Sequence, residues 1–189
     1  MQHILSLSYG KDSLACLGAI EQLGWPLDRI VHAEIWATDT IPADLPPMVE
    51  FKAKADKIIK ERWGIEVEHI RSVLSYEDVF YRIYSNSKKG KNGKIYGFPI
   101  TGKGQWCTGK LKQKTMRMIR GNADVQYLGI AADEPDRIRK NTKPMNKMPL
   151  VEIGWDEAYC RKWCEENDLL SPIYTTVARG GVGFATTRP

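Results

Sequence analysis

The sequence has few cysteines and no long apolar run: its 189 residues include only four Cys. No stretch approaches the length of a membrane-spanning helix. The first residues enter an apolar segment directly, without the basic region or cleavage site of a signal peptide. Four thiols in such a chain do not predict disulfides. We therefore expect a cytoplasmic protein with no membrane partner.

The charge of the chain is only modestly positive, at +5. This balance suits an anionic ligand but is too small to establish nucleic-acid binding. The clearest basic cluster is Lys-Lys-Gly-Lys-Asn-Gly-Lys at 88–94, whose Gly and Asn content is typical of a solvated loop. The alternative is that the cluster forms a lid that binds phosphate. This cluster is also the one feature of the sequence that points toward a nucleic-acid partner.

The order of apolar and amphipathic segments predicts an α/β fold in a single domain, residues 1–189. Apolar runs alternate with helical patterns, which is typical of an open, mostly parallel twisted sheet with helices on both faces. The expected strands are 3–8, 30–36, 65–70, 125–130 and a short one at 150–153. The expected helices are 12–24, 44–63, 76–84, 110–120 and 155–167, and 132–147 is expected to be an active-site loop.

The segment Ser-Tyr-Gly-Lys-Asp-Ser at 8–13 joins the first expected strand to its helix. The first N–H groups of a helix lack internal partners and carry the positive end of its dipole, so such a turn can bind phosphate. It is not a Walker loop, because Leu5 stands where that motif needs glycine. An ordinary helix start, capped by a side chain, is the alternative. The candidate nucleotide-binding residues here are Ser8, Tyr9, Gly10, Lys11, Asp12 and Ser13.

Three further polar clusters follow expected strands or begin expected helices. Thr-Asp-Thr at 38–40 follows the second strand and could equally be a capped turn before Pro42. Trp-Cys-Thr-Gly-Lys-Leu-Lys at 106–112 places a thiol and two lysines at a helix start, although the thiol could be structural. Gly-Ile-Ala-Ala-Asp-Glu-Pro-Asp-Arg at 129–137 follows the fourth strand, and a plain charged loop is its alternative.

These motifs together resemble the PAPS reductase family of the adenine nucleotide α-hydrolase superfamily. The segment at 8–13, Ser-x-Gly-Lys-Asp-Ser, is similar to the PP-loop of N-type ATP pyrophosphatases. The segment at 106–112 resembles the Trp-Cys-Thr-x-x-Leu-Lys pattern of the family. The 129–137 stretch looks like the family's Gly-Ile-x-x-Asp/Glu-Glu-Ser-x-Arg, with Pro135 where serine is usual. The resemblance extends to Ser-Pro-Ile-Tyr at 171–174, nearly the whole chain.

The resemblance implies an enzyme that binds an adenine nucleotide, ATP or PAPS. Because Lys11 and Asp12 are both present, it favours attack on the α-phosphate of ATP with release of pyrophosphate, with magnesium held in part by Asp12. The product would serve sulfur metabolism or thio-modification, and the second substrate is unknown. A thiol-dependent PAPS or sulfonucleotide reductase and a non-catalytic nucleotide-binding module remain the alternatives.

The resemblance also assigns expected roles to individual residues. The expected catalytic residues are Lys11, Asp12, Asp133, Glu134, Arg137 and Cys107. Beside the 8–13 loop, the nucleotide would contact Asp39, Thr40 and Gly129, and a substrate anion would contact Lys110 and Lys112.

The remaining cysteines do not form a redox or cluster motif. Cys160 and Cys164 share one face of an expected helix, with a spacing that favours packing, so no iron–sulfur cluster is expected in this form. Relatives tend to continue after Arg-Gly-Gly with Cys-x-Phe-Cys, whereas this chain reads Val-Gly-Phe-Ala from Val182. A one-base frameshift would produce this change, so 179–189 is interpreted as an altered or truncated tail, with a natural cysteine-free variant as the alternative.

Overall fold

The structure is a computed structural model that describes residues 1–85, 91–99, 106–121 and 124–174. Its sheet has five strands, all parallel, in the order β3-β2-β1-β4-β5. These strands are β1 (His3–Ser6), β2 (Arg29–Glu34), β3 (Val67–Arg71), β4 (Val125–Tyr127) and β5 (Asn146–Lys147). The predicted α/β fold with a parallel sheet is confirmed.

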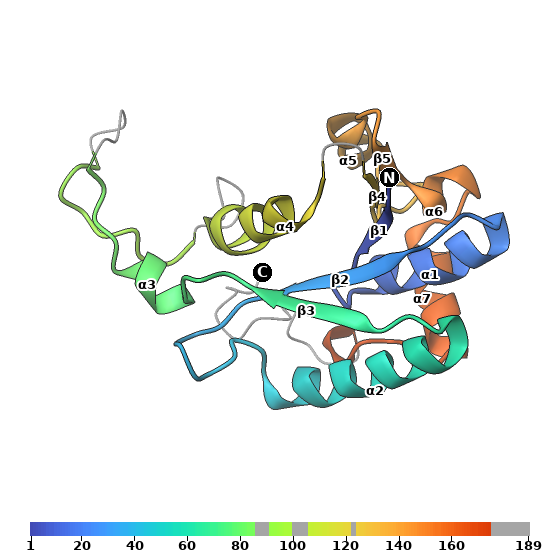
Figure 1. The fold of residues 1–189 in the computed structure, drawn as a ribbon, viewed down its shortest axis with the longest axis horizontal. Coiled ribbons are helices and arrows are strands. Elements are labelled where there is room, and N and C mark those ends of the chain that lie inside the picture. The colour runs from blue at the N-terminus through green and yellow to red at the C-terminus, as the bar shows by residue number, and fades with distance from the viewer. Residues whose placement is uncertain (86–90, 100–105, 122–123, 175–189) are drawn as a thin grey trace.

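Helices cover both faces of this sheet, as the sequence predicts. Figure 1 shows α1 (Lys11–Leu23), α2 (Pro46–Trp63) and α7 (Glu157–Glu166) on one side and α4 (Lys114–Ile119) on the other. The shorter helices are α3 (Tyr76–Phe80), the π-helix η1 (Cys107–Gln113), α5 (Pro135–Asn141), α6 (Pro149–Glu152) and the 3-10 helix η2 (Pro172–Tyr174). Among the described residues, none of the helices has both the length and the apolar character that a membrane span requires.

The long helices begin and end where their local sequence dictates. Two prolines occupy the first turn of α2, where their missing N–H groups would have no helical partner. Both α1 and α2 end at a glycine in the left-handed conformation, Gly24 at φ 63° and Gly64 at φ 70°. β2 is buried along its four central residues, as expected for a strand covered on both faces.

The main core lies between the sheet and the helices α1, α2 and α7. At the contact of α1 with α7, a Cβ added to Gly18 would lie 2.4 Å from Cζ2 of Trp163, so the two helices are packed too closely for any larger residue. A smaller apolar cluster at the end of β2 joins α3 to η1, with the rings of Tyr76 and Trp106 4.7 Å apart. This second cluster fixes the position of η1 beside the carboxyl edge of the sheet.

Several predicted elements differ from the structure. Residues 150–153 are not a strand: Pro149 begins the helix α6, and both Pro149 and Leu150 are buried. A short apolar run fits a buried strand or a buried helical turn equally well, which explains the error. The expected loop 132–147 contains α5 and β5. The helix expected over 76–84 ends at Phe80, and the chain continues into an antiparallel pairing of Ile83 with Ile95.

Other predictions fall outside the part of the chain that the structure describes. The altered tail predicted at 179–189 is one, and the first three residues of the basic cluster at 88–94 are another.

Candidate functional site

The loop from β1 to α1 lies where the strand order reverses. β1 pairs with β2 on one side and with β4 on the other, and open α/β sheets bind ligands at the carboxyl ends of strands at this point. Tyr9 has φ 57°, an uncommon conformation for a residue other than glycine, and Gly10 is the N-cap of α1. Non-glycine residues held in this region often mark functional sites.

Hydrogen bonds within the loop hold it in one shape. The Ser13 hydroxyl accepts from the backbone N–H of Ser8 at 3.1 Å and from its hydroxyl at 3.0 Å. Ser13 in turn donates to the carbonyl oxygen of Gly10 at 2.9 Å. The first N–H of α1, that of Lys11, donates to the hydroxyl of Tyr174 at 3.2 Å. The two serines therefore shape the loop, and Tyr174 covers the start of the helix.

A cavity of about 180 Å³ opens against this loop. Its lining combines the start of α1 with the end of β2, the first half of α2 and η1. Two of the lining side chains are cations, Lys52 and Lys112, and one is an acid, Asp44. The full lining is Ser8, Gly10, His32, Ala33, Ile35, Asp44, Met48, Lys52, Lys112 and Ile173. The fold thus brings together, at one cavity, three of the residues that the sequence predicts to bind a ligand: Ser8, Gly10 and Lys112.

Lys52 is buried and held by two partners. Its ammonium group forms an ion pair with Asp44 and donates to Nε2 of His32 at 2.8 Å. Nδ1 of His32 lies 2.9 Å from the carbonyl oxygen of Leu7, which can only accept, so Nδ1 carries the proton. Burial, assisted by the charge of Lys52, lowers the pKa of His32 to about 3. His32 is therefore neutral, and its unprotonated Nε2 accepts the hydrogen bond from Lys52 at the cavity wall.

Lys112 differs from Lys52 because nothing in the described chain pairs with its ammonium group. It lines the cavity from η1, and no hydrogen bond or ion pair to a described residue involves its side chain. Burial lowers the pKa of Lys112, although the nearby carboxylate of Asp44 opposes the effect. A half-buried cation without a partner in the described chain has lost part of its hydration, and an anion in the cavity would compensate for that loss.

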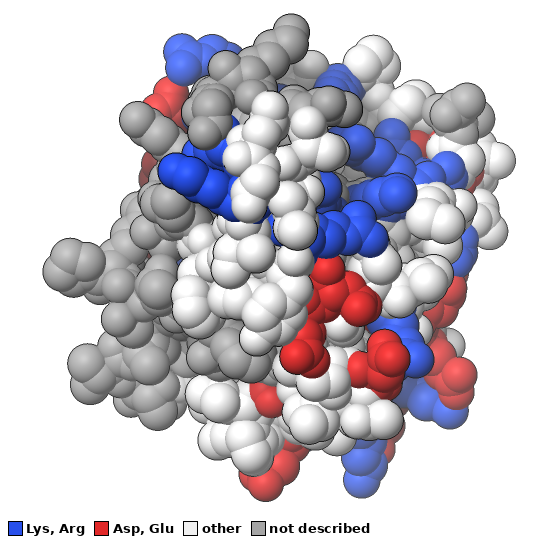
Figure 2. Space-filling view, turned by 90° about the vertical axis from the view of Figure 1, so that its left-hand side faces the viewer, with Lys and Arg blue, Asp and Glu red and all other residues white. Residues whose placement is uncertain are grey.

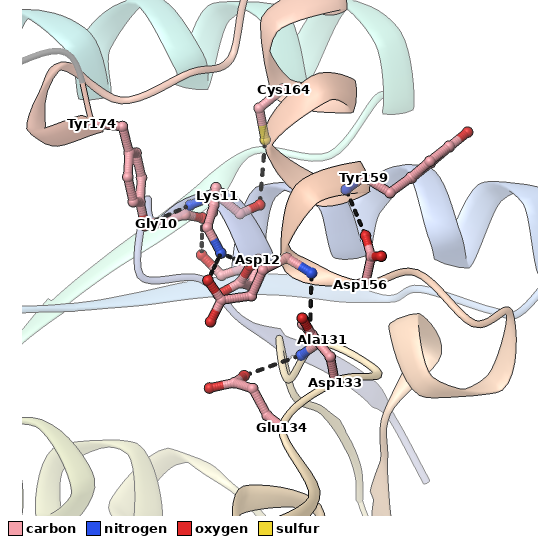
Figure 3. Close-up of polar contacts among 12 residues, drawn as sticks. Gly10, Lys11, Asp12, Ala131, Asp133, Glu134, Asp156, Tyr159, Cys164 and Tyr174 are labelled. Carbon is pink, nitrogen blue, oxygen red and sulfur yellow. Dashed lines mark hydrogen bonds and ion pairs between the residues drawn. The ribbon is translucent and has the colours of Figure 1, made fainter.

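Acidic residues lie on the other side of the loop, around Lys11. Figure 3 shows Lys11 beside Asp12, with Asp133 and Glu134 nearby. The ammonium group of Lys11 is 2.6 Å from Asp12 and 3.2 Å from Glu157. Burial alone would lower the pKa of Lys11, but its bonds to these two carboxylates raise it. Lys11 therefore neutralises acids in this structure and does not line the cavity.

The other predicted acidic residues hold the backbone around this cluster. Asp133 accepts from the N–H of Glu157 at 3.1 Å, and Glu134 accepts from that of Ala131 at 3.2 Å. Arg137 is bound to both carboxylate oxygens of Glu134, at 2.7 and 2.6 Å. The structure thus gathers Lys11, Asp12, Asp133 and Glu134 in one place, with Arg137 at its edge.

The described residues do not form a ready-made magnesium site. Among them, no group of three or more His, Cys, Asp or Glu side chains is arranged to hold a metal ion. Asp12 is engaged by Lys11, and burial raises the pKa of Asp12 despite that bond. Magnesium usually binds through one or two carboxylates together with substrate phosphates. The described residues therefore fit a magnesium ion only in part.

Other predicted residues lie away from the cavity. The buried Tyr9 donates its hydroxyl to Asp56, and its ring packs edge-on against His32 at 4.7 Å. Lys110 turns toward Tyr96, whose ring centre is 4.8 Å from the ammonium nitrogen. Cys107 is half-buried at the start of η1. Neither Tyr9 nor Lys110 is part of the cavity lining.

Asp39 lines a second cavity of about 290 Å³ at the ends of β2 and β3. In this cavity Arg71 lies 4.6 Å from the ring centre of Trp36 and donates to the carbonyl oxygen of Asp39 at 3.2 Å. Thr40 follows on the same loop and is exposed. Ile35 lines the first cavity and the next residue, Trp36, lines the second, so the chain just after β2 leads from one cavity to the other.

Gly129 has a packing role that explains its residue type. A Cβ at this position would lie 2.7 Å from both the nitrogen and the Cα of Ser13. Only glycine lets the segment after β4 approach the first turn of α1 this closely. Gly129 was predicted to contact the nucleotide, and in the structure it positions the loop that lines the cavity.

The three cysteines outside η1 pack in the core. Cys16, Cys160 and Cys164 are fully buried, which is what the packing interpretation predicts for Cys160 and Cys164. The Cys164 thiol donates to the carbonyl oxygen of Lys11 at 3.3 Å. Burial raises the pKa of Cys160 and of Cys164 to about 12, so both are thiols at neutral pH.

Sequence reasoning missed five residues of the site: His32, Asp44, Lys52, Glu157 and Tyr174. One of them had a detectable signal. Met48, Lys52, Ala55 and Ile59 form a buried stripe of α2, so a lysine stands in an otherwise apolar helix face. Glu157 has no such signal, because its partner Lys11 is distant in sequence.

No protein-family model matches this sequence, and neither a curated protein nor a solved structure matches it significantly.

Proposed function

We propose that this chain is an enzyme that binds an adenine nucleotide and promotes attack on the α-phosphate of ATP, as its resemblance to the PAPS reductase family implies. The observation that carries the proposal is the cavity at the start of α1, which is lined by Ser8, by Gly10 and by the half-buried Lys112, whose ammonium group has no partner among the described residues. A cation and the positive end of a helix dipole then converge on one space.

The size of the cavity indicates which part of a nucleotide it would hold. Its volume of about 180 Å³ is smaller than the roughly 300 Å³ at which pockets for drug-sized ligands begin. Phosphate groups would therefore occupy the cavity, and the nucleoside would lie outside it. The second cavity, lined by Asp39 and Trp36, is the nearest candidate for the nucleoside.

In the proposed reaction, an oxygen of the second substrate attacks the α-phosphorus. The bond from that phosphorus to the pyrophosphate oxygen breaks, and pyrophosphate leaves with the electron pair. Lys112, Lys52 and the start of α1 would stabilise the negative charge that develops on the leaving group. The rigid Ser8–Ser13 hydrogen bonds would keep the loop in place during the reaction.

A PAPS reductase, the alternative from the sequence, needs a reactive thiolate. Cys16, Cys160 and Cys164 are buried thiols whose pKa is raised. Among the described residues only Cys107 is partly exposed. The cysteines of the described chain therefore favour ATP chemistry over reduction. The third alternative, a nucleotide-binding module without turnover, is distinguished from both enzymes by the assays below.

Isothermal titration with ATP and with adenosine, together with an assay for pyrophosphate, tests the proposal. We expect ATP to bind, and Lys112→Met to weaken ATP at least about tenfold because a charge-assisted contact is lost. Adenosine binding should change little. The matched control is Lys57→Met, which removes an exposed charge from α2 whose one ionic partner among the described residues is Glu61.

Each other outcome has a defined meaning. Failure of every adenine nucleotide to bind would refute the proposal. ATP binding without pyrophosphate release under any acceptor would indicate a binding module, and thiol-dependent release of sulfite from PAPS would indicate the reductase.

A further inference from the structure

The middle of the chain contains a long segment with charge of only one sign. Between Asp78 and Asp124 there are eleven Lys and Arg residues and no Asp or Glu. The whole chain has a net charge of only +5, so the rest of the sequence is net acidic. Such segregation of charge within one domain is typical of proteins that bind a polyanion.

The cations of this segment that the structure describes have no ionic partners among the described residues. There are eight such cations: Arg82, Lys91, Lys94, Lys110, Lys112, Lys114, Arg117 and Arg120. None of these eight forms a salt bridge with a described carboxylate, whereas eleven Lys and Arg residues elsewhere do. Their positive charge is therefore not neutralised by the described part of the protein.

Six of these cations, all except the cavity-lining Lys112 and Arg120 after the end of α4, belong to one surface, which we call the basic face. It is formed by the described residues of 81–98 together with η1 and α4. The rings of Tyr84 and Tyr96 stack at 4.0 Å, Lys91 lies 5.6 Å from the ring centre of Tyr84, and Lys110 bonds to the hydroxyl of Tyr96. This stack connects the arm at 81–98 with η1. Figure 2 looks onto the side that carries the arm, and Lys and Arg form a band across it.

Aromatic side chains are exposed on the same face. Tyr81 is 61% exposed and Phe98 is 60% exposed. Both rings contact Phe80, with ring centres 4.9 Å away, so they are held at the base of the arm. Exposed rings beside unpaired cations are the combination that binds single strands, because bases stack on the rings while phosphates contact the cations.

We propose that the basic face binds single-stranded nucleic acid. The face suits this partner better than an anionic membrane, because the arm is an antiparallel pairing with stacked tyrosines, whereas membrane-surface binding typically uses an amphipathic helix. It suits a strand of phosphates better than a single small anion, because its cations extend from the arm through η1 to α4. The inference is independent of nucleotide chemistry in the cavity.

Fluorescence anisotropy with a labelled 20-nucleotide poly-uridine RNA at several salt concentrations tests this inference. The face variant combines Lys91→Gln, Lys94→Gln and Arg117→Gln, all exposed positions outside the cavity. The control variant combines Lys57→Gln, Arg139→Gln and Lys162→Gln, which removes the same charge from exposed sites elsewhere.

We expect the face variant to bind at least about tenfold more weakly at low salt, and its salt dependence to fall by about two units in log–log slope, since each phosphate contact contributes about 0.7. The control variant should bind like wild type. Phe98→Ala should weaken binding about fivefold or more without changing the salt slope, because it removes stacking and no charge.

Two results would overturn the inference. One is an equal loss of affinity in the face and control variants, which would mean that only net charge matters. The other is binding to vesicles of phosphatidylserine and phosphatidylcholine with no binding to the RNA. Thermal melting of each variant shows that it is folded, and ATP titration of the same samples reports on the cavity separately.

Discussion

Replacement of Gly129 by alanine tests how tightly β4 is packed against the start of α1. The new Cβ would lie 2.7 Å from two backbone atoms of Ser13, roughly 0.8 Å short of the ~3.5 Å at which carbon contacts become favourable. Backbone atoms cannot rotate away as a side chain does. Overpacking of this kind typically costs about 1–3 kcal/mol, so we expect Gly129→Ala to lower the free energy of unfolding by about 2 kcal/mol.

Urea unfolding followed by far-ultraviolet circular dichroism measures this loss. With a slope of about 1–3 kcal/mol per molar urea, a loss of ~2 kcal/mol moves the midpoint by about 1 M. Under the proposed function, a backbone shift in the loop at 8–13 should also slow pyrophosphate release, by up to about 10²-fold for a displacement near 1 Å.

Gly109→Ala is the matched control for this prediction. Gly109 lies in η1, and a Cβ there would meet nothing within 4 Å. Alanine in a helix is favoured over glycine by about 0.5–1 kcal/mol, so the control should be neutral or slightly stabilising. Equal urea midpoints for wild type and Gly129→Ala would refute the reasoning that this contact requires glycine.

Two other substitutions test the packing and the charge network. Gly18→Ala should lower the free energy of unfolding by about 1–3 kcal/mol, because its Cβ would meet the Trp163 ring at 2.4 Å; an unchanged urea midpoint would contradict the close contact of α1 with α7. His69 bonds to Asp56 and Glu34, and these bonds raise its pKa to about 9. The folded-state pKa is above the unfolded value near 6.5, so this contribution is complete below pH 6.5 and is lost as the pH rises through 9. The stability difference between wild type and His69→Gln should therefore shrink over that range, and a difference that is constant with pH would exclude this linkage.

Local sequence patterns predicted the parallel sheet and the positions of its first four strands. The apolar run before the 8–13 loop became β1, and the glycines after α1 and α2 ended those helices. These features depend on neighbours in sequence, namely hydrophobic periodicity and the conformational freedom of glycine. The errors at 132–153 arose where elements are short: β5 has two residues and α6 has four, too few to show a period.

The candidate site was predicted in part. Of the residues predicted to bind a ligand, Ser8, Gly10 and Lys112 line the cavity, and their role in binding stays a prediction. Lys11, by contrast, pairs with Asp12 and Glu157, and Lys110 contacts Tyr96. A motif identifies residue types, whereas the direction of a lysine side chain depends on which carboxylates and rings surround it after folding.

The sequence by itself determined that β1 leads through a serine- and glycine-containing turn into α1, because strand, turn and helix are each specified by adjacent residues. Only the tertiary structure decided that Lys52 and Lys112, sixty positions apart in the chain, would share one cavity. It also decided that His32 would be neutral between Leu7 and Lys52. Burial and electrostatic pairing arise from groups that meet across the fold, and no local pattern encodes those meetings.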